Sequence, residues 1–213
     1  CSVVKVFFLV AALQRLKDGT IQTHDDLTQA MRDIISVSSN AGTNYIIDLV
    51  TGTTGETLLP PAEMMAWREK RHWVNRYFAS WGWPEFTDIN LTQKLTDEVR
   101  YGREREFLGA NGAGHNRLST DATARLFHAI FTGRAVDAEA SKIAVDHLWR
   151  PIDPKWIEEE PRCQILGYFG EGLPKGSRLW SKAGRTVWTG DPTASFRRHD
   201  AAYVELPAGQ AFT

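Results

Sequence analysis

The order of hydrophobic patterns along the amino-acid sequence predicts an α+β protein with two lobes. Up to about residue 160, apolar residues recur mainly at helical spacing, and glycine or proline separates the runs. From about residue 161 onward the runs are short and typical of strands. Helices followed by antiparallel strands are typical of the α+β class. We expect a single domain over 1–213, with a mainly helical lobe over about 1–160 and antiparallel strands over about 161–213.

The first predicted helix runs from Ser2 to about Lys17 and stops at the turn signal Asp18-Gly19. Its apolar run, Val6–Leu13, has no polar face. A helix that is hydrophobic all round is buried, so this helix should lie inside the fold.

Further helices follow at helical spacing, each opened by a capping residue or proline or closed by a turn signal. They are expected at Leu27–Ile35, Asn44–Val50, Ala62 to about Trp81, Asp121 to Gly133, and Asp137 to about Trp149. Between them, Gly82–Ser119 reads as one long irregular stretch that contains an Ω-like loop near 87–118. A loop of that length inside a domain is usually functional.

Strands are predicted at Lys182–Trp188 and Ala201–Leu206, joined through Gly190-Asp191-Pro192. The last residues, Gln210–Thr213, look like the start of another strand. Because the chain also begins without methionine, in a predicted buried helix, we expect both ends to be cut and flanking strands to be missing.

The composition of the chain argues against several classes of function. The formal charge is −1 without blocks of one sign, which indicates no nucleic-acid partner. No apolar run is long enough to span a membrane. The two cysteines and six histidines match no metal-ligand spacing that we would rely on, so neither a metal nor a cofactor is expected.

Ser2-x-x-Lys5 is the first candidate site. The spacing puts both side chains on one face of the first turn, and a serine there lies at the positive end of the helix dipole. A half-buried lysine beside it is under pressure to lose its proton, so Ser2 is a plausible activated nucleophile. The alternative is a serine N-cap followed by a surface lysine.

Two further triplets follow in order: Ser38-Ser39-Asn40 between helices, and Lys182-Ala183-Gly184 at a late strand. With Ser2-x-x-Lys5, they resemble the S-x-x-K, S-D-N and K-T-G motifs of class A β-lactamases and penicillin-binding proteins. Ser38–Asn44 also resembles the longer S-D-N-x-x-x-N stretch, and Asn116–Thr120 resembles the segment after the Ω-loop of class A enzymes. The resemblance covers nearly the whole chain and implies a β-lactamase/transpeptidase-like fold.

The resemblance also implies roles. Ser2 would attack a carbonyl, Lys5 would act as base, and Ser38 would relay a proton to the leaving nitrogen. The backbone N–H groups of Ser2 and Arg185 would form the oxyanion hole. The substrate-binding residues implied are Asn40, Asn44, Lys182, Ala183, Gly184 and Arg185. Taken singly, the same residues are also ordinary turn residues or a solvated strand charge.

Three departures from the family pattern stand out. Ser39 replaces aspartate, and Ala183 replaces a hydroxyl residue that would bind a substrate carboxylate, a role that Arg185 or Thr186 could take over. The E-x-x-L-N pattern of the Ω-loop is absent. Glu104 is the first candidate for the missing deacylation base and Glu106 the second; alternatively both are surface ion-pair partners of Arg103 and Arg105, worth little energetically.

We therefore expect a serine hydrolase that forms an acyl-enzyme on Ser2 with a β-lactam or related amide. A D-alanyl-D-alanine peptidase or an esterase with the same nucleophile is one alternative. A non-catalytic relative that binds ligands in the same cleft is another. The resemblance implies a periplasmic or secreted bacterial protein acting on a small molecule.

Overall fold

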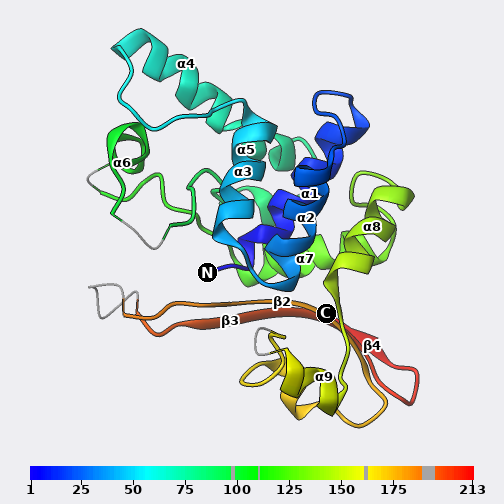
Figure 1. Cartoon of the computed structure of the whole chain (residues 1–213). Coiled ribbons are helices and arrows are strands. Elements are labelled where there is room, and N and C mark those ends of the chain that lie inside the picture. Colours follow the sequence, from blue (N-terminus) through cyan, green and yellow to red (C-terminus); the bar gives the residue numbers. More distant parts are fainter. Residues whose placement is uncertain (97–98, 110, 161–162, 189–194) are drawn as a thin grey trace. The chain divides into compact units, whose positions relative to one another are not determined.

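The computed structural model describes residues 1–96, 99–109, 111–160, 163–188 and 195–213, and its contacts divide the chain into two units. The sheet unit comprises Cys1–Val6, Ile35–Ser38 and Thr123–Thr213. The helical unit comprises Phe7–Ile34 and Ser39–Ala122. Helices together with an antiparallel sheet confirm the predicted α+β class (Figure 1).

The elements follow one another as α1 Val4–Lys17, α2 Asp25–Ser36, α3 Asn40–Thr51, α4 Pro61–Arg71, α5 Trp73–Ala79, η1 Pro84–Phe86, α6 Gly102–Leu108, α7 Thr120–Phe131, α8 Ala138–Leu148, β1 Trp149–Arg150, α9 Pro154–Glu159, η2 Phe169–Gly172, β2 Arg178–Arg185, β3 Arg198–Glu205 and β4 Ala211–Phe212. In the described part of the chain, no helix combines the length and the apolar character needed to cross a bilayer.

The sheet unit contains a four-stranded antiparallel sheet in the order β1-β2-β3-β4. β2 pairs with β3 along its whole length, with Gly184 opposite His199. On its other edge β2 pairs with β1 only at Leu179 and Trp180. Both long strands begin before their predicted starts, and the predicted Gly190–Pro192 turn lies outside the described residues.

The two faces of this sheet bury different side chains, as the two-residue period of a strand requires. Leu179 and Val204 pack with Trp156 of α9, a short helix that the sequence analysis did not predict. On the opposite face, Phe131 stacks on Tyr203 with ring centroids 3.9 Å apart. Figure 1 accordingly shows α9 across the sheet from the end of α7 and from α8.

In the helical unit, α1 is buried as predicted: every residue from Phe7 to Ala12 is fully inaccessible. The helix predicted from Ala62 to Trp81 is wrong in one respect, because it breaks at His72 into α4 and α5. The buried residues continue through the break at helical spacing, namely Met64, Trp67, Arg71, Val74 and Phe78. An uninterrupted stripe carries no sign of a break, which explains the error.

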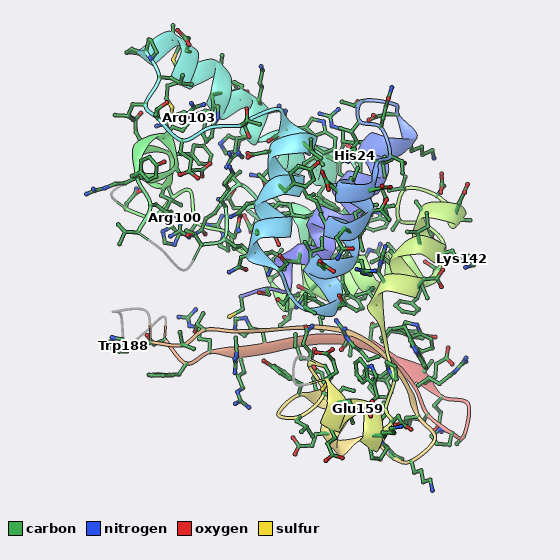
Figure 2. The ribbon with its side chains drawn as sticks, in the orientation of Figure 1. His24, Arg100, Arg103, Lys142, Glu159 and Trp188 are labelled. Atoms are coloured by element: carbon green, nitrogen blue, oxygen red, sulfur yellow. The ribbon has the colours of Figure 1, made fainter. Side chains whose placement is uncertain are left out.

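The stretch predicted as one irregular loop over Gly82–Ser119 contains η1 and α6. α6 starts at Gly102, whose φ is +52° and where a Cβ would collide with the Glu56 carbonyl group. The buried Arg103 guanidinium donates to the carbonyl oxygens of Thr57, at 2.7 Å, and Thr54, at 3.0 Å. These contacts hold α6 to the chain that precedes α4; Figure 2 labels Arg103.

Candidate active site

Ser2 lies in a turn directly before α1 rather than inside the helix, since α1 begins at Val4. The Lys5 backbone N–H donates to the Ser2 carbonyl oxygen at 3.1 Å, which closes that turn. The Lys5 side chain is completely buried, so the alternative of a surface lysine is wrong.

Ser38 brings two lysines together within the sheet unit. Its backbone has a φ of +59°, a left-handed conformation that is uncommon outside glycine. Lys5 Nζ donates to the Ser38 carbonyl oxygen at 2.5 Å and to Ser38 Oγ at 3.2 Å. Lys182 Nζ donates to the same Oγ at 3.0 Å. Because both lone pairs of Oγ accept hydrogen bonds from amines, the hydroxyl proton of Ser38 points away from Lys5 and Lys182.

Lys182 is a fully buried amine with an acceptor for each of its three protons. These acceptors are Ser38 Oγ, the Ala183 carbonyl oxygen, and Gln164 Oε1 at 2.6 Å. Burial lowers the pKa of Lys182 well below that of free lysine, and the charges of Lys5 and Arg150 lower it further, whereas Asp200 raises it. The three neutral acceptors work against this effect, because they stabilise the ammonium form.

Gly184 lets the Ser2 turn approach β2. A Cβ at Gly184 would collide with the Ser2 nitrogen and lie 2.7 Å from Cys1 Cβ. The Thr186 N–H donates toward β3, to Arg197 O at 2.9 Å, whereas the Ala183 N–H donates to Gln164 Oε1 at 3.1 Å. Since N–H directions alternate along an antiparallel strand, the Arg185 N–H points to the same edge of β2 as that of Ala183.

Asn40 and Asn44 belong to the helical unit, where α3 begins at Asn40, with Ser39 as its N-cap. Ser39 Oγ accepts the Gly42 N–H at 3.0 Å, which is the usual role of serine at this position. The side-chain amide of Asn44 makes two hydrogen bonds of 2.7 Å with the backbone N–H and carbonyl of Leu95. In the structure Asn44 thus anchors the start of the Ω-like loop, while its role toward substrate stays a prediction.

Glu104, the predicted base, is a buried member of the helical unit. Its two carboxylate oxygens accept N–H groups of Arg71 at 2.7 and 3.1 Å. Glu106 is exposed and pairs with Arg68 at 3.1 Å. The ion-pair partners expected from the sequence, Arg103 and Arg105, are therefore wrong; both actual partners come from α4.

Two residues that the sequence analysis missed hold this part of the sheet unit. Gln164 accepts from Lys182 and Ala183 and donates to two carbonyl oxygens at the end of α2. The buried Arg150 donates to the carbonyl oxygens of Ile35 and Ser181, at 2.5 and 3.3 Å. No sequence signal identifies them, since most of their partners are backbone groups brought near by folding.

Solved structures place this arrangement of helices and sheet in a known class. A β-lactamase from Sphaerobacter thermophilus DSM 20745 matches with a TM-score of 0.63 at 22% identity, covering 100% of this chain and 71% of that one. An ancestral class A β-lactamase, GNCA, matches with a TM-score of 0.56 at 15% identity, covering 99% of this chain and 72% of that one. The fold is that of the class A β-lactamases.

The family follows from the sequence itself. The model of the beta-lactamase enzyme family matches residues 1–213, and the chain belongs to that family. Membership makes it a β-lactamase-like hydrolase and confirms the resemblance inferred from the three motifs. No curated protein matches the chain.

Proposed function

We propose that the chain acts as a serine hydrolase and forms an acyl-enzyme on Ser2 with a β-lactam or a related amide. One observation carries the proposal: Ser38 Oγ accepts hydrogen bonds from both Lys5 and Lys182. Two amines that share one acceptor repel as cations, which favours a neutral form of one of them. In the proposal Lys5 is the amine that acts as the base, which is the role that the family resemblance implies.

In the proposed acylation, Ser2 Oγ attacks the amide carbon while Lys5 Nζ accepts the hydroxyl proton. The N–H groups of Ser2 and Arg185 donate to the oxyanion that forms. As the C–N bond breaks, the Ser38 hydroxyl gives its proton to the leaving nitrogen and regains one from Lys5. The Lys182 ammonium stabilises the negative charge that develops on Ser38 Oγ during this transfer. Asn40, Asn44 and the strand Lys182–Arg185 bind the substrate.

Deacylation requires a base that activates water, and Glu104 is the proposed residue, with Glu106 second. Both oxygens of Glu104 accept hydrogen bonds from the Arg71 guanidinium, which leaves fewer lone pairs free to hold a water molecule. This pairing favours slow hydrolysis and a long-lived acyl-enzyme, and the missing hydroxyl at Ala183 removes one donor to a substrate carboxylate. A penicillin-binding peptidase or an esterase with the same nucleophile is therefore the second candidate, and a non-catalytic ligand-binding relative the third.

The test is labelling of the purified chain with a fluorescent penicillin. Ser2→Ala should abolish the covalent label, whereas Ser80→Ala, a control at an exposed serine, should leave it unchanged. A label that persists indicates acylation with slow turnover, and release of the opened product indicates a β-lactamase. Absence of a label on the folded wild-type protein would contradict β-lactam acylation, and turnover of a nitrophenyl ester would then separate an esterase from a binding protein.

A further inference from the structure

We propose that Gln164 is a positioning residue of this site: its side-chain amide holds Lys182, and the strand that carries it, in register with the turn at Ser38. This inference deepens the proposed function and rests on it. Gln164 lies between two parts of the sheet unit that are far apart in sequence, the end of α2 and β2.

The amide of Gln164 uses all of its hydrogen-bonding capacity. Oε1 accepts from Lys182 Nζ at 2.6 Å and from the Ala183 N–H at 3.1 Å. Nε2 donates to the carbonyl oxygens of Ile35 and Ser36, both at 2.9 Å. Exchanging the oxygen and nitrogen would set donors against donors and acceptors against acceptors, so the orientation of the amide is fixed.

The partners of Gln164 are the backbone and side chain that carry the proposed chemistry. Ile35 and Ser36 lie just before Ser38, and Lys182 donates to Ser38 Oγ. The amide therefore closes a loop of hydrogen bonds, in which Lys182 contacts Ser38 directly and is also tied to the backbone before Ser38. Loss of Oε1 would leave one Lys182 proton without an acceptor in a buried place.

The backbone of Gln164 is strained, which indicates that its position matters. Its φ is +59°, a left-handed conformation that costs a residue with a side chain free energy and that clusters at functional sites. The side chain gains four hydrogen bonds in return. The next residue, Ile165, is buried in the apolar cluster with Leu179 and Val204, which fixes the chain on that side.

The charged groups that face Lys182 set the expected direction of change. They are Lys5 from α1, Arg150 from β1, Asp200 from β3 and the α-amino group of Cys1. Gln164→Met removes the acceptor and should lower the pKa of Lys182. Gln164→Glu places a carboxylate beside the amine and should raise it. Variants with nearly equal side-chain length thus predict opposite shifts.

The primary measurement is the pKa of Lys182, followed by NMR in protein that carries isotope-labelled lysine, with the signal assigned by its loss in Lys182→Met. The second measurement is the rate of labelling by a fluorescent penicillin as a function of pH. Gln164→Met should slow labelling at least tenfold, up to about a hundredfold, as expected for a displaced catalytic group. Its alkaline limb should move to lower pH, and that of Gln164→Glu to higher pH. Gln29→Met, at an exposed glutamine of α2, is the control and should change neither quantity.

The outcomes separate the two proposals. If neither variant changes the pKa of Lys182, or if both shift it in the same direction, Gln164 does not hold the amine and the inference is overturned. If penicillin does not label the wild type, the proposed function fails, and the NMR shifts still decide the role of Gln164. A loss of thermal stability without either shift would show a merely structural residue. Should Gln164→Met not fold, Gln164→Glu against wild type decides alone.

Discussion

Two buried clusters of charged residues, one in each unit, are built on different principles. In the helical unit, Arg71 pairs with Glu104 at 2.7 Å, and Lys94 pairs with Asp48 at 2.6 Å. In the sheet unit, Lys182 and Arg150 donate instead to neutral oxygens of side chains and backbone. The first cluster pairs opposite charges directly, whereas the second brings Lys5, Lys182 and Arg150 near one another with Asp200 as a nearby acidic group.

The difference indicates what each cluster is for. A buried ion pair resists the loss of either partner, since the remaining charge has no compensation. Buried cations held by neutral acceptors repel one another, and such repulsion is how proteins shift the proton affinity of an amine. The helical cluster thus has the character of a structural support, and the sheet cluster fits the reactive site that we propose.

The largest effect on stability is expected for Arg71→Met, which leaves the buried Glu104 without its partner. The free energy of unfolding should fall by about 3–5 kcal/mol, measured by urea denaturation. Arg76→Met is the matched control, because it breaks an exposed pair with Glu69 and should cost less than about 1 kcal/mol. Equal losses in both variants would contradict a supporting role for the buried pair.

Lys182→Met should affect the rate of penicillin labelling more than the free energy of unfolding. Labelling by a fluorescent penicillin should slow by about 10²–10³-fold, comparable to the loss of an electrostatic group in other active sites. The free energy of unfolding should fall by about 1–3 kcal/mol, less than in Arg71→Met, because the buried acceptors that lose Lys182 are neutral. A loss of stability as large as that of Arg71→Met would remove the distinction between the clusters.

The carboxyl of Asp200 provides a test by pH. Burial raises its pKa to about 6, although two backbone hydrogen bonds and the charges of Lys182 and Arg150 lower it. The folded state therefore binds a proton between about pH 4 and 6 that the unfolded state has lost, so stability should fall as pH rises through this window and level off above it. The expected loss is about 1–3 kcal/mol, and Asp200→Asn should abolish it. Urea denaturation at several pH values measures both, and an identical pH dependence in the two proteins would contradict the raised pKa.

The smallest effect is expected at the exposed pair of Lys142 and Asp146 on α8 (Figure 2). These residues lie four apart on one helix, with side chains 76% and 64% exposed. Lys142→Gln should change the free energy of unfolding by less than about 0.5 kcal/mol, and salt should reduce even that. Thermal unfolding measures this change. A larger change would show that the exposure of an ion pair does not decide how much it stabilises this protein.

The sequence predicts the local parts of the fold well. α1 follows from an unbroken apolar run, and the strands around Lys182 and Ala201 follow from turn signals and short runs. The three motifs also carry the family resemblance, since each is contained in three or four neighbouring residues. These features depend on the chain close to each residue, where sequence patterns are informative.

Features that depend on distant backbone could not be predicted. Gln164 meets Ile35 and Ser36 across 128 or 129 positions of the chain, and carbonyl groups have no sequence signature. Glu104 finds Arg71 rather than its neighbours because α6 packs as a helix, a fact hidden in an apparently irregular stretch. Sequence reasoning therefore supplies candidate groups, while folding decides what each of them contacts.

The absence of a side chain at Gly184 lets the Ser2 backbone lie directly against β2. Because only a hydrogen atom separates this strand residue from the Ser2 backbone, a methyl group would push the serine off its place. A saturation-mutagenesis library screened for penicillin labelling should thus return glycine alone at this position, even though the stretch around it looks like ordinary strand.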